Sequence, residues 1–214
     1  MLRILIADDH FLVRKGLRQL LEEHLPVKSV DEAGEGREAL ELASASRYDL
    51  VILDFSMPGM DGLDLIKELR ARDAGLHILV LSILPEEQYA VRAFKLGASG
   101  CINKAVDPAE LLEAVKTVAE GHRYLSQRAR DLVVDTIVED REEPHARLSD
   151  REFQILRLLA SGRSVGEIAR LCSLSVKTVS TYRTRMLEKM GMENNNQLIC
   201  YAFKHGLAGQ DQGV

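Results

Sequence analysis

Five polar side chains follow short, mostly apolar runs in the first half of the chain. They are two adjacent acids, a third acid, a serine and a lysine, namely Asp8, Asp9, Asp54, Ser82 and Lys104. The run before Asp54, Leu50–Leu53, is apolar throughout and is followed by turn-forming residues, which is typical of a strand buried on both faces. In open α/β sheets the ligand crevice lies at the carboxyl ends of the strands, so we expect these side chains to share one crevice.

The chemistry that this set supports is phosphoryl transfer to a carboxylate. Three carboxylates cannot all stay ionised in one cleft without a counter-charge, and a hard cation such as Mg²⁺ can supply that charge beside a phosphate. Asp54 can act as a nucleophile towards phosphorus, while Lys104 and Ser82 can hold oxygens of the transferred group. Singly, each residue is also explained as a helix cap, a turn serine or a loop lysine. Their joint position favours the phosphoacceptor interpretation.

Five strand-like runs alternate with five helical patterns over residues 1–120. Strands are expected at residues 3–7, 27–33, 50–53, 77–81 and 100–103, and helices at about 10–24, 35–46, 61–72, 86–97 and 107–120. The last helix is marked by Asp107 as its N-cap and by Pro108 at its first position. This alternation predicts a doubly wound α/β domain with a five-stranded parallel sheet covered on both faces. If the strands lie in the flavodoxin-like order 2-1-3-4-5, the first and third strands are neighbours and the three acids share one crevice.

The net charge changes sign along the chain. Residues 1–120 carry a net charge of −7, residues 121–146 carry −2 and residues 147–214 carry +4, within a total of −5. The middle segment is predicted to be a linker, with a helix over Ser126–Val138 and an exposed charged stretch up to Pro144. The basic third segment indicates contact with a polyanion.

Residues 147–214 are predicted to form a small all-helical domain. Two capping boxes, which begin at Ser149 and Ser164, open the first two helices. Ser175 is placed to cap a third helix over Val176–Met190, and a fourth helix follows at about residues 195–205. A tight turn at residues 173–175 joins the second and third helices, and this arrangement matches a helix-turn-helix.

The third of these helices has an apolar and a polar face at about 100° per residue. The apolar face, which is expected to pack inward, consists of Val176, Val179, Met186, Leu187 and Met190. The opposite face carries hydroxyl and basic side chains, which are Lys177, Thr178, Ser180, Thr181, Thr184 and Arg185. Such side chains suit phosphates and base edges in a DNA major groove, although an ordinary solvated helix has the same pattern. The positive charge of the segment favours DNA.

Composition points to the cytoplasm. No apolar stretch approaches the ~20 residues that span a bilayer, and the first residues lack the features of a signal peptide. The three cysteines, Cys101, Cys172 and Cys200, are widely spaced, form no metal-ligand pattern and favour a reducing compartment. We expect a cytoplasmic protein that does not contact a membrane.

Residues 1–120 resemble the receiver domain of a two-component response regulator. The matching elements are Asp8-Asp9, Asp54 with Met57-Pro58 and Gly62, Ser82, and Lys104 before Ala105-Val106-Asp107-Pro108. The resemblance implies that a histidine kinase phosphorylates Asp54, and that Asp9 and Asp54 bind Mg²⁺ with help from Asp8 and the Ser56 carbonyl. It also implies that Ser82 and Lys104 switch by contacting the new phosphate. Cys101 departs from the pattern, because the family usually has an aromatic residue three positions before the lysine.

Residues 147–208 resemble a LuxR-type helix-turn-helix domain, the output module of the NarL/FixJ class of response regulators. The matching segments are Leu148-Ser149-x-Arg151-Glu152, Leu158-Leu159-Ala160-x-Gly162, Glu167-Ile168-Ala169, Leu174-Ser175-x-Lys177-Thr178-Val179 and Leu187-x-Lys189-Met190. The resemblance implies that Val176–Met190 is the recognition helix, with Ser180, Thr181 and Thr184 in the groove. It further implies dimerisation through the last helix, where Leu198, Ile199, Ala202 and Phe203 form either a dimer contact or an intradomain packing stripe.

Together these features predict a transcription regulator that is switched by phosphorylation of Asp54 and binds promoter DNA as a homodimer when phosphorylated. One rival is a phosphatase with an aspartyl-phosphate intermediate, but the haloacid dehalogenase type needs a second aspartate where Ser56 stands. A second rival is a DNA-binding protein whose receiver acts without phosphorylation. The acid set opposes that rival, whereas Cys101 favours it.

Overall fold

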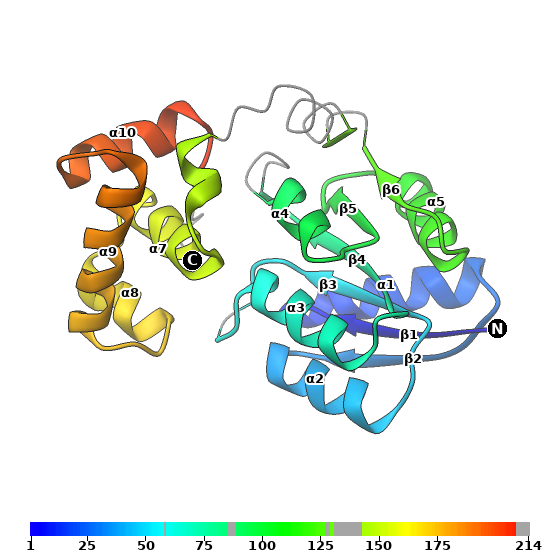
Figure 1. Cartoon of the computed structure of the whole chain (residues 1–214). Helices are drawn as coiled ribbons and strands as arrows, with labels where there is room; N and C mark the ends of the chain where they lie inside the picture. The colour runs from blue at the N-terminus through cyan, green and yellow to red at the C-terminus, as the bar shows by residue number, and fades with distance from the viewer. Residues whose placement is uncertain (58, 85–88, 127–128, 131–142, 209–214) are drawn as a thin grey trace. The chain divides into compact units, whose positions relative to one another are not determined.

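The computed structural model describes residues 1–57, 59–84, 89–126, 129–130 and 143–208. The chain divides into two compact units, residues 1–132 and 133–214. Figure 1 labels the α-helices and strands of both units.

The first unit is built on a parallel sheet. Its strands are β1 (Leu2–Ala7), β2 (Val27–Ala33), β3 (Leu50–Asp54), β4 (His77–Ser82), β5 (Gly100–Asn103) and β6 (Tyr124–Leu125). They lie in the order β2-β1-β3-β4-β5-β6, and all the pairings are parallel. The predicted five strands and their 2-1-3-4-5 order are confirmed. The sheet also continues past residue 120, because Tyr124 and Leu125 pair with Gly100 and Cys101.

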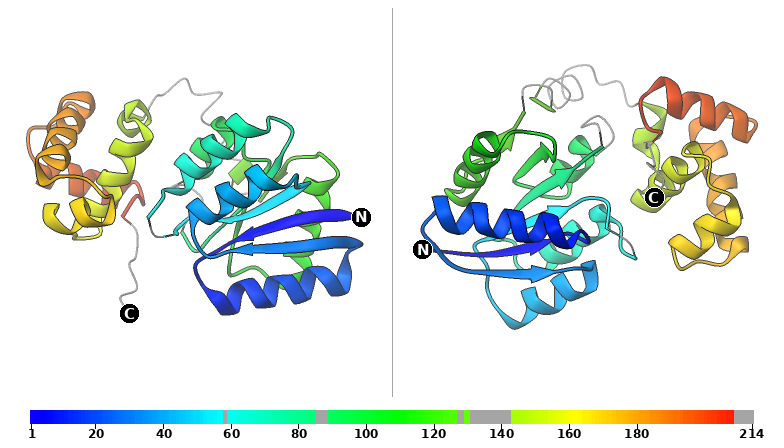
Figure 2. Two further views of the ribbon diagram at one scale, coloured as in Figure 1. Left: turned by 90° about the horizontal axis from the view of Figure 1, so that it is seen from below. Right: turned by 180° about the vertical axis from the view of Figure 1, so that it is seen from behind.

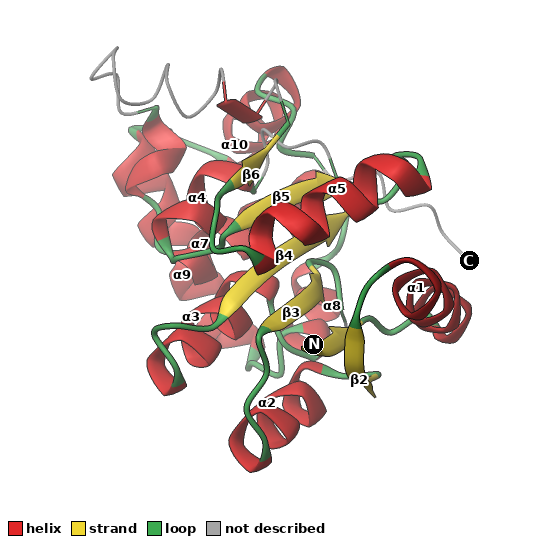
Figure 3. Cartoon of the chain, turned by 90° about the vertical axis from the view of Figure 1, so that its right-hand side faces the viewer, coloured by secondary structure: helices red, strands yellow, loops and turns green. Residues whose placement is uncertain are grey.

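Helices cover both faces of this sheet. They are α1 (Phe11–His24), α2 (Gly36–Ala45), α3 (Gly62–Arg72), α4 (Ala90–Lys95) and α5 (Pro108–Ala119). Figure 3 shows α1 and α5 on one side of the strands and α2, α3 and α4 on the other. Right-handed crossovers that run in opposite directions along the sheet place their helices on opposite faces, so α1, between β1 and β2, lies opposite α2, α3 and α4.

Alternation along the strands builds one core on each face of the sheet. A cluster of buried side chains on the α1 and α5 side includes Ile4, Ile6, Leu50 and Ile52, together with Val115 of α5. Successive strand side chains point to opposite faces, so the intervening residues face the other three helices. Both views of Figure 2 show α1, in blue, lying along the strands of the sheet. The inner strands β1, β3, β4 and β5 are largely buried on both faces, so their carboxyl ends emerge from a closely packed layer.

Two predicted helices fall partly or largely on residues that the structure does not describe. The helix expected at 86–97 begins at Ala90 and ends at Lys95, while residues 85–88 lie outside the described part of the chain. The linker helix expected over Ser126–Val138 falls largely on residues that the structure does not describe. Asp107 accepts hydrogen bonds from the amides of Ala109 and Glu110, so the N-cap predicted for α5 is confirmed.

The second unit is helical in its described residues. It contains a short 3-10 helix, η2 (Pro144–Arg147), and the helices α7 (Asp150–Ala160), α8 (Val165–Leu171), α9 (Val176–Met190) and α10 (Asn195–Lys204). Ser149 with Glu152 and Ser164 with Glu167 form the two predicted capping boxes. Ser175 accepts a hydrogen bond from the Thr178 amide and caps α9.

A charged contact ties the beginning of α7 to the end of α9. The Glu152 side chain is buried, and its Oε2 lies 2.6 Å from Lys189 Nζ and 2.8 Å from the Ser149 amide. Between α8 and α9, Ser173 adopts φ +53° and turns the chain. The lengths and caps of α8 and α9 are therefore set by local hydrogen bonds, and their mutual position is set by this turn. None of the helices among the described residues is both long and apolar enough to cross a membrane.

Candidate functional site

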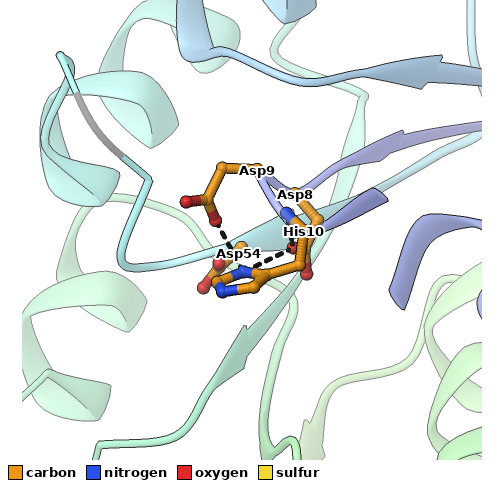
Figure 4. A group of neighbouring side chains, drawn as sticks. All are labelled: Asp8, Asp9, His10 and Asp54. Atoms are coloured by element: carbon orange, nitrogen blue, oxygen red, sulfur yellow. Dashed lines mark hydrogen bonds and ion pairs between the residues drawn. The ribbon is translucent and has the colours of Figure 1, made fainter. Parts of the chain in front are cut away.

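The acids predicted to share a crevice do lie together. Asp8 follows β1 and Asp54 ends β3, and these strands are neighbours in which Ala7 pairs with Leu53. Both carboxylates are almost completely buried, with 1% and 3% of the residue exposed. Figure 4 shows Asp8, Asp9, His10 and Asp54 gathered at this edge of the sheet. The position agrees with the general rule for ligand crevices in open α/β sheets.

Lys104 supplies the counter-charge for the two buried acids. Its Nζ lies 2.6 Å from Asp8 Oδ2 and 2.8 Å from Asp54 Oδ2. Burial raises the pKa of Asp54, and the Lys104 ammonium opposes that shift without cancelling it. Burial alone would lower the pKa of Lys104, but the Asp54 and Asp8 carboxylates raise it above its ordinary value. The lysine therefore stays charged, and one cation balances two carboxylates.

Asp9 and His10 form the exposed side of the site. His10 Nδ1 lies 2.9 Å from Asp9 Oδ1 and 3.4 Å from Asp8 Oδ1. Asp8, Asp9, His10 and Asp54 each offer a ligand atom, and these four atoms lie within 4.8 Å of one another. We did not single out His10 from the sequence, although its position directly after two acids was a signal. This group of residues is able to hold a metal ion.

Ser56 acts through its backbone amide, whereas Ser82 acts through both its hydroxyl and its carbonyl. The Ser56 amide donates a hydrogen bond of 3.0 Å to Asp54 Oδ1. Ser82 is fully buried, and its Oγ accepts a hydrogen bond of 3.0 Å from the Leu84 amide. The Lys104 amide donates to the Ser82 carbonyl over 2.9 Å. The predicted serine and lysine are thus held side by side at the ends of β4 and β5.

Cys101 is buried on β5, where it pairs with Val80 of β4. A different aromatic residue lies near the site: the ring of Tyr89 is almost fully buried and its centroid is 4.9 Å from that of Phe55. Phe55 directly follows Asp54 in the chain. Sequence patterns did not identify Tyr89, because it precedes a short helix with few periodic positions.

Gly62 has a direct steric role beside the site. A Cβ at this position would lie 2.7 Å from the Phe55 carbonyl oxygen and 2.8 Å from its ring. Those separations are much shorter than van der Waals contact, so only glycine lets α3 begin this close to the segment after β3. In the motif Met57-Pro58 with Gly62, the glycine is therefore required because a larger residue would clash with Phe55. Pro58 lies outside the described residues.

The predicted DNA-binding side chains lie on one helix, α9. Lys177, Thr181, Thr184 and Arg185 are exposed, and Thr178 and Ser180 are half-buried. Three hydroxyls donate to the carbonyl four residues earlier: Ser180 to Val176, Thr181 to Lys177 and Thr184 to Ser180. A hydroxyl that donates in this way can still accept hydrogen bonds through its lone pairs.

A surface hollow of about 280 Å³ lies along α9 and contains a residue that the sequence did not indicate. Its lining combines basic and hydroxyl groups, and consists of Lys177, Thr178, Thr181, Tyr182 and Arg185. Tyr182 stands four residues after Thr178 and so projects from the same side of the helix. The phenol of Tyr182 therefore belongs to the same surface as the predicted polar side chains of α9.

One of the apolar predictions for α9 is wrong, and the stripe of α10 divides between the interior and the surface. Val176, placed on the inward face by its helical angle, is 55% exposed, because the angle gives the direction of a side chain but not whether another element covers it. Val179, Met186 and Met190 are buried as expected. In α10, Leu198 and Ala202 are buried within the domain, whereas Phe203 is 64% exposed. The stripe of α10 therefore contributes both to packing and to the surface.

Fold and site together define a receiver domain joined to a helix-turn-helix. Residues 4–116 match the family model "Response regulator receiver domain", and residues 146–202 match "Bacterial regulatory proteins, luxR family". Response regulator UvrY of Escherichia coli O6:H1 is 35% identical over 213 residues, covering 99% of this chain and 98% of the relative. Response regulator GacA of Pseudomonas aeruginosa is 32% identical, covering 97% and 98%.

Solved structures agree with these sequence relatives. RcsB of Salmonella enterica serovar Typhimurium, bound to the promoter rprA in the presence of phosphomimetic BeF3⁻, is similar with a TM-score of 0.68 and 28% identity. The match covers 94% of this chain and 97% of that chain. The chain belongs to the NarL/FixJ class of two-component response regulators. It is a DNA-binding transcription regulator that receives its signal from a kinase, and not a turnover enzyme.

Proposed function

We propose that Asp54 is the phosphoacceptor through which a sensor histidine kinase controls DNA binding by this chain. In the reaction a carboxylate oxygen of Asp54 bonds to phosphorus as the phosphorus–nitrogen bond to the kinase imidazole breaks, and the electron pair returns to the imidazole. The observation that carries the proposal is the contact of Lys104 Nζ with Asp54 Oδ2 at 2.8 Å in a buried crevice. A lysine there stabilises negative charge on the arriving phosphoryl group.

Receiver domains bind Mg²⁺ at an acidic pocket, and the donors present here fit that ion. The oxygen ligands that we propose are the carboxylates of Asp8, Asp9 and Asp54 and the carbonyl of Ser56. Carboxylate oxygens and water are the ligands that Mg²⁺ prefers. When bound, the ion would supply positive charge next to the phosphoryl oxygens. The chain's own part is to fix the carboxylates, which the Ser56 amide and Lys104 do for Asp54.

We propose that Ser82 and Lys104 carry the switch, while Cys101 stands at the switch position where the family usually has an aromatic residue. Phosphorylation adds up to about two negative charges next to Asp54, so Lys104 has a new partner and its contact with Asp8 weakens. The Ser82 hydroxyl can donate to a phosphoryl oxygen, because its present hydrogen bond with Leu84 uses it only as an acceptor. Cys101 has no ring to swing inward, so the readout passes through the loop after Ser82.

The output of this switch is binding of double-stranded promoter DNA by α9. We propose contacts from Lys177, Thr178, Ser180, Thr181, Thr184 and Arg185, which present hydroxyl and basic groups on one helix. The phosphorylated chain is proposed to act as a homodimer, with the exposed Phe203 of α10 at the contact. The proposed functional limits are residues 1–120 for the receiver, 121–146 for the linker and 147–214 for the DNA-binding domain. A regulator that acts on the chromosome works in the cytoplasm.

The decisive experiment combines Asp54→Asn with a small-molecule phosphodonor. Acetyl phosphate and Mg²⁺ should label the wild type once per chain at Asp54 and raise its affinity for an operator, whereas D54N should show neither effect. The matched control is Asp49→Asn at the opposite end of β3, where an amide oxygen can still accept the hydrogen bond from the Arg3 amide. D49N should behave as the wild type.

Two outcomes would replace this proposal. DNA binding that ignores both D54N and the phosphodonor would favour a receiver that works without phosphorylation. Rapid multiple turnover of acetyl phosphate, in place of stoichiometric labelling, would contradict the family assignment and favour a phosphatase.

A further inference from the structure

His10 gives the acid site a nitrogen ligand next to its oxygen ligands. The Nδ1 atom is turned towards the acids, at 2.9 Å from Asp9 Oδ1 and 3.4 Å from Asp8 Oδ1. It belongs to a group of four ligand atoms that lie within 4.8 Å of one another, the other three being carboxylate oxygens. Metal–ligand bonds of ~2.1 Å place ligands on opposite sides of an ion ~4.2 Å apart, so small side-chain movements bring all four into one shell.

Lys104 and the imidazole occupy different sides of the carboxylates. The lysine contacts the Oδ2 atoms of Asp8 and Asp54. The imidazole faces the Oδ1 atoms of Asp8 and Asp9. A cation on the imidazole side therefore does not have to displace Lys104, and Figure 4 shows the ring lying against the acids.

The chemistry of the ligand set decides which ion gains from this arrangement. Oxygen ligands suit Mg²⁺, whereas an imidazole nitrogen suits Zn²⁺ and neighbouring first-row ions. We infer that His10 is a metal ligand, so that the site binds a Zn²⁺-like transition ion more tightly than Mg²⁺. The inference rests on the proposed metal site of the receiver and goes beyond it by adding a nitrogen ligand and a different class of ion.

His10 can be replaced without disturbing the helix that it precedes. It is the N-cap residue of α1, but its side chain makes no capping hydrogen bond. The imidazole is 67% exposed, so its removal leaves no cavity. His10→Phe keeps a flat ring of similar size and removes both nitrogens. His122→Phe, at an exposed histidine just after the receiver, is the matched control.

The experiment titrates the full chain with Co²⁺, whose visible absorption reports nitrogen ligation and stands in for Zn²⁺. Mg²⁺ affinity is measured separately by calorimetry. We expect H10F to bind Co²⁺ at least about tenfold more weakly than the wild type and to lose the nitrogen-dependent absorption. Its Mg²⁺ affinity should change by less than about twofold, because that ion relies on the carboxylates. H122F should match the wild type in both titrations.

Each alternative result has a definite meaning. Equal Co²⁺ binding by H10F and the wild type would overturn the inference, as would a parallel fall in Co²⁺ and Mg²⁺ affinity. Phosphorylation of Asp54 is scored independently with acetyl phosphate and Mg²⁺. A chain that is labelled at Asp54 but shows no effect of H10F keeps the proposed function and loses this inference. A chain that takes no label but shows the H10F effect keeps this inference alone.

Discussion

The acid site and the exposed face of α9 are built in opposite ways. The acid site joins residues up to 96 positions apart in the chain, and its two central carboxylates are at most 3% exposed. The face of α9 comes from nine consecutive positions of one helix, Lys177 to Arg185, and many of its side chains are in solvent. One region depends on the fold for its existence, and the other depends on a single helix and its caps.

This contrast has an energetic consequence. Buried charges interact strongly because little water screens them, so the loss of one partner changes the state of the others. Exposed charges are screened and act almost independently. We therefore expect changes at the acid site to have large coupled effects, and changes on α9 to have smaller and separable ones. Four experiments test this comparison.

The largest effect is expected for Lys104→Met. Without the ammonium, Asp8 and Asp54 lose their common counter-charge, and the receiver should be destabilised by about 3 kcal/mol. Burial raises the pKa of Asp54 above 3.8, so ionised Asp54 costs stability as pH rises through the folded pKa. The loss should therefore be greater at pH 7.5 than at pH 4. Hydrogen exchange of the β1 and β3 amides in the full chain measures it.

The control for this change is Lys15→Met at the exposed pair with Glu32, where the lysine side chain is 49% exposed. Lys15→Met should lower the stability of the receiver by only about 0.5 kcal/mol. Equal losses for K104M and K15M would break the contrast between buried and exposed charges.

The second effect concerns Glu152, a buried charge within the DNA-binding domain. Burial would raise its pKa, but the Lys189 ammonium and the Ser149 hydrogen bonds hold it below 4.5. The resulting stability is present above pH 4.5 and is lost as pH falls through the lower folded pKa. Glu152→Gln should lower the free energy of unfolding of this domain by about 2 kcal/mol at pH 7. It should also make that free energy depend less on pH in the acid range.

Hydrogen exchange of the α7 and α9 amides between pH 4 and pH 7 measures the effect. Glu167→Gln, in the exposed second capping box, is the matched control and should cost less. An unchanged acid dependence in E152Q would show that other groups control the stability of this domain.

The third effect separates two roles on α9. Lys177→Ala should weaken binding to all DNA sequences about equally and reduce the slope of log affinity against log salt by about 1. Ser180→Ala should leave that slope unchanged and alter the preference at one base pair by about 1 kcal/mol. Fluorescence anisotropy over a salt series, with Lys67→Ala of α3 as the charge control, measures both. Identical effects of K177A and S180A would contradict the independence of these side chains.

The smallest effect is expected in the turn between α8 and α9. Ser173 has φ +53°, a conformation that costs a non-glycine residue about 1 kcal/mol. Ser173→Gly should stabilise the domain by up to about 1 kcal/mol, reduced by the greater freedom of glycine in the unfolded chain. Ser161→Gly, at φ −78°, should destabilise it instead. Thermal unfolding measures the difference, and a loss of stability in S173G would show that its side chain contributes more than its backbone costs.

Much of the local structure was predictable, because it depends on neighbours in the chain. Capping boxes at Ser149 and Ser164 and the Asp107 N-cap each involve residues within three positions. The parallel sheet also followed from the alternation of strands and helices, although that alternation does not fix the order of the strands. Val176 was misplaced, since helical angle gives the direction of a side chain but not whether another helix covers it.

Patterns in the chain were enough to predict which residues end the strands, and that three acids, a serine and a lysine would meet. The folded sheet was needed to show how these side chains meet. Lys104 bridges Asp8 and Asp54, His10 turns its Nδ1 to the acids, and Tyr89 packs on Phe55. The physical reason is distance along the chain: caps and periodicity arise from adjacent residues, whereas atoms of distant residues approach within 3 Å only after the sheet has fixed the strand ends.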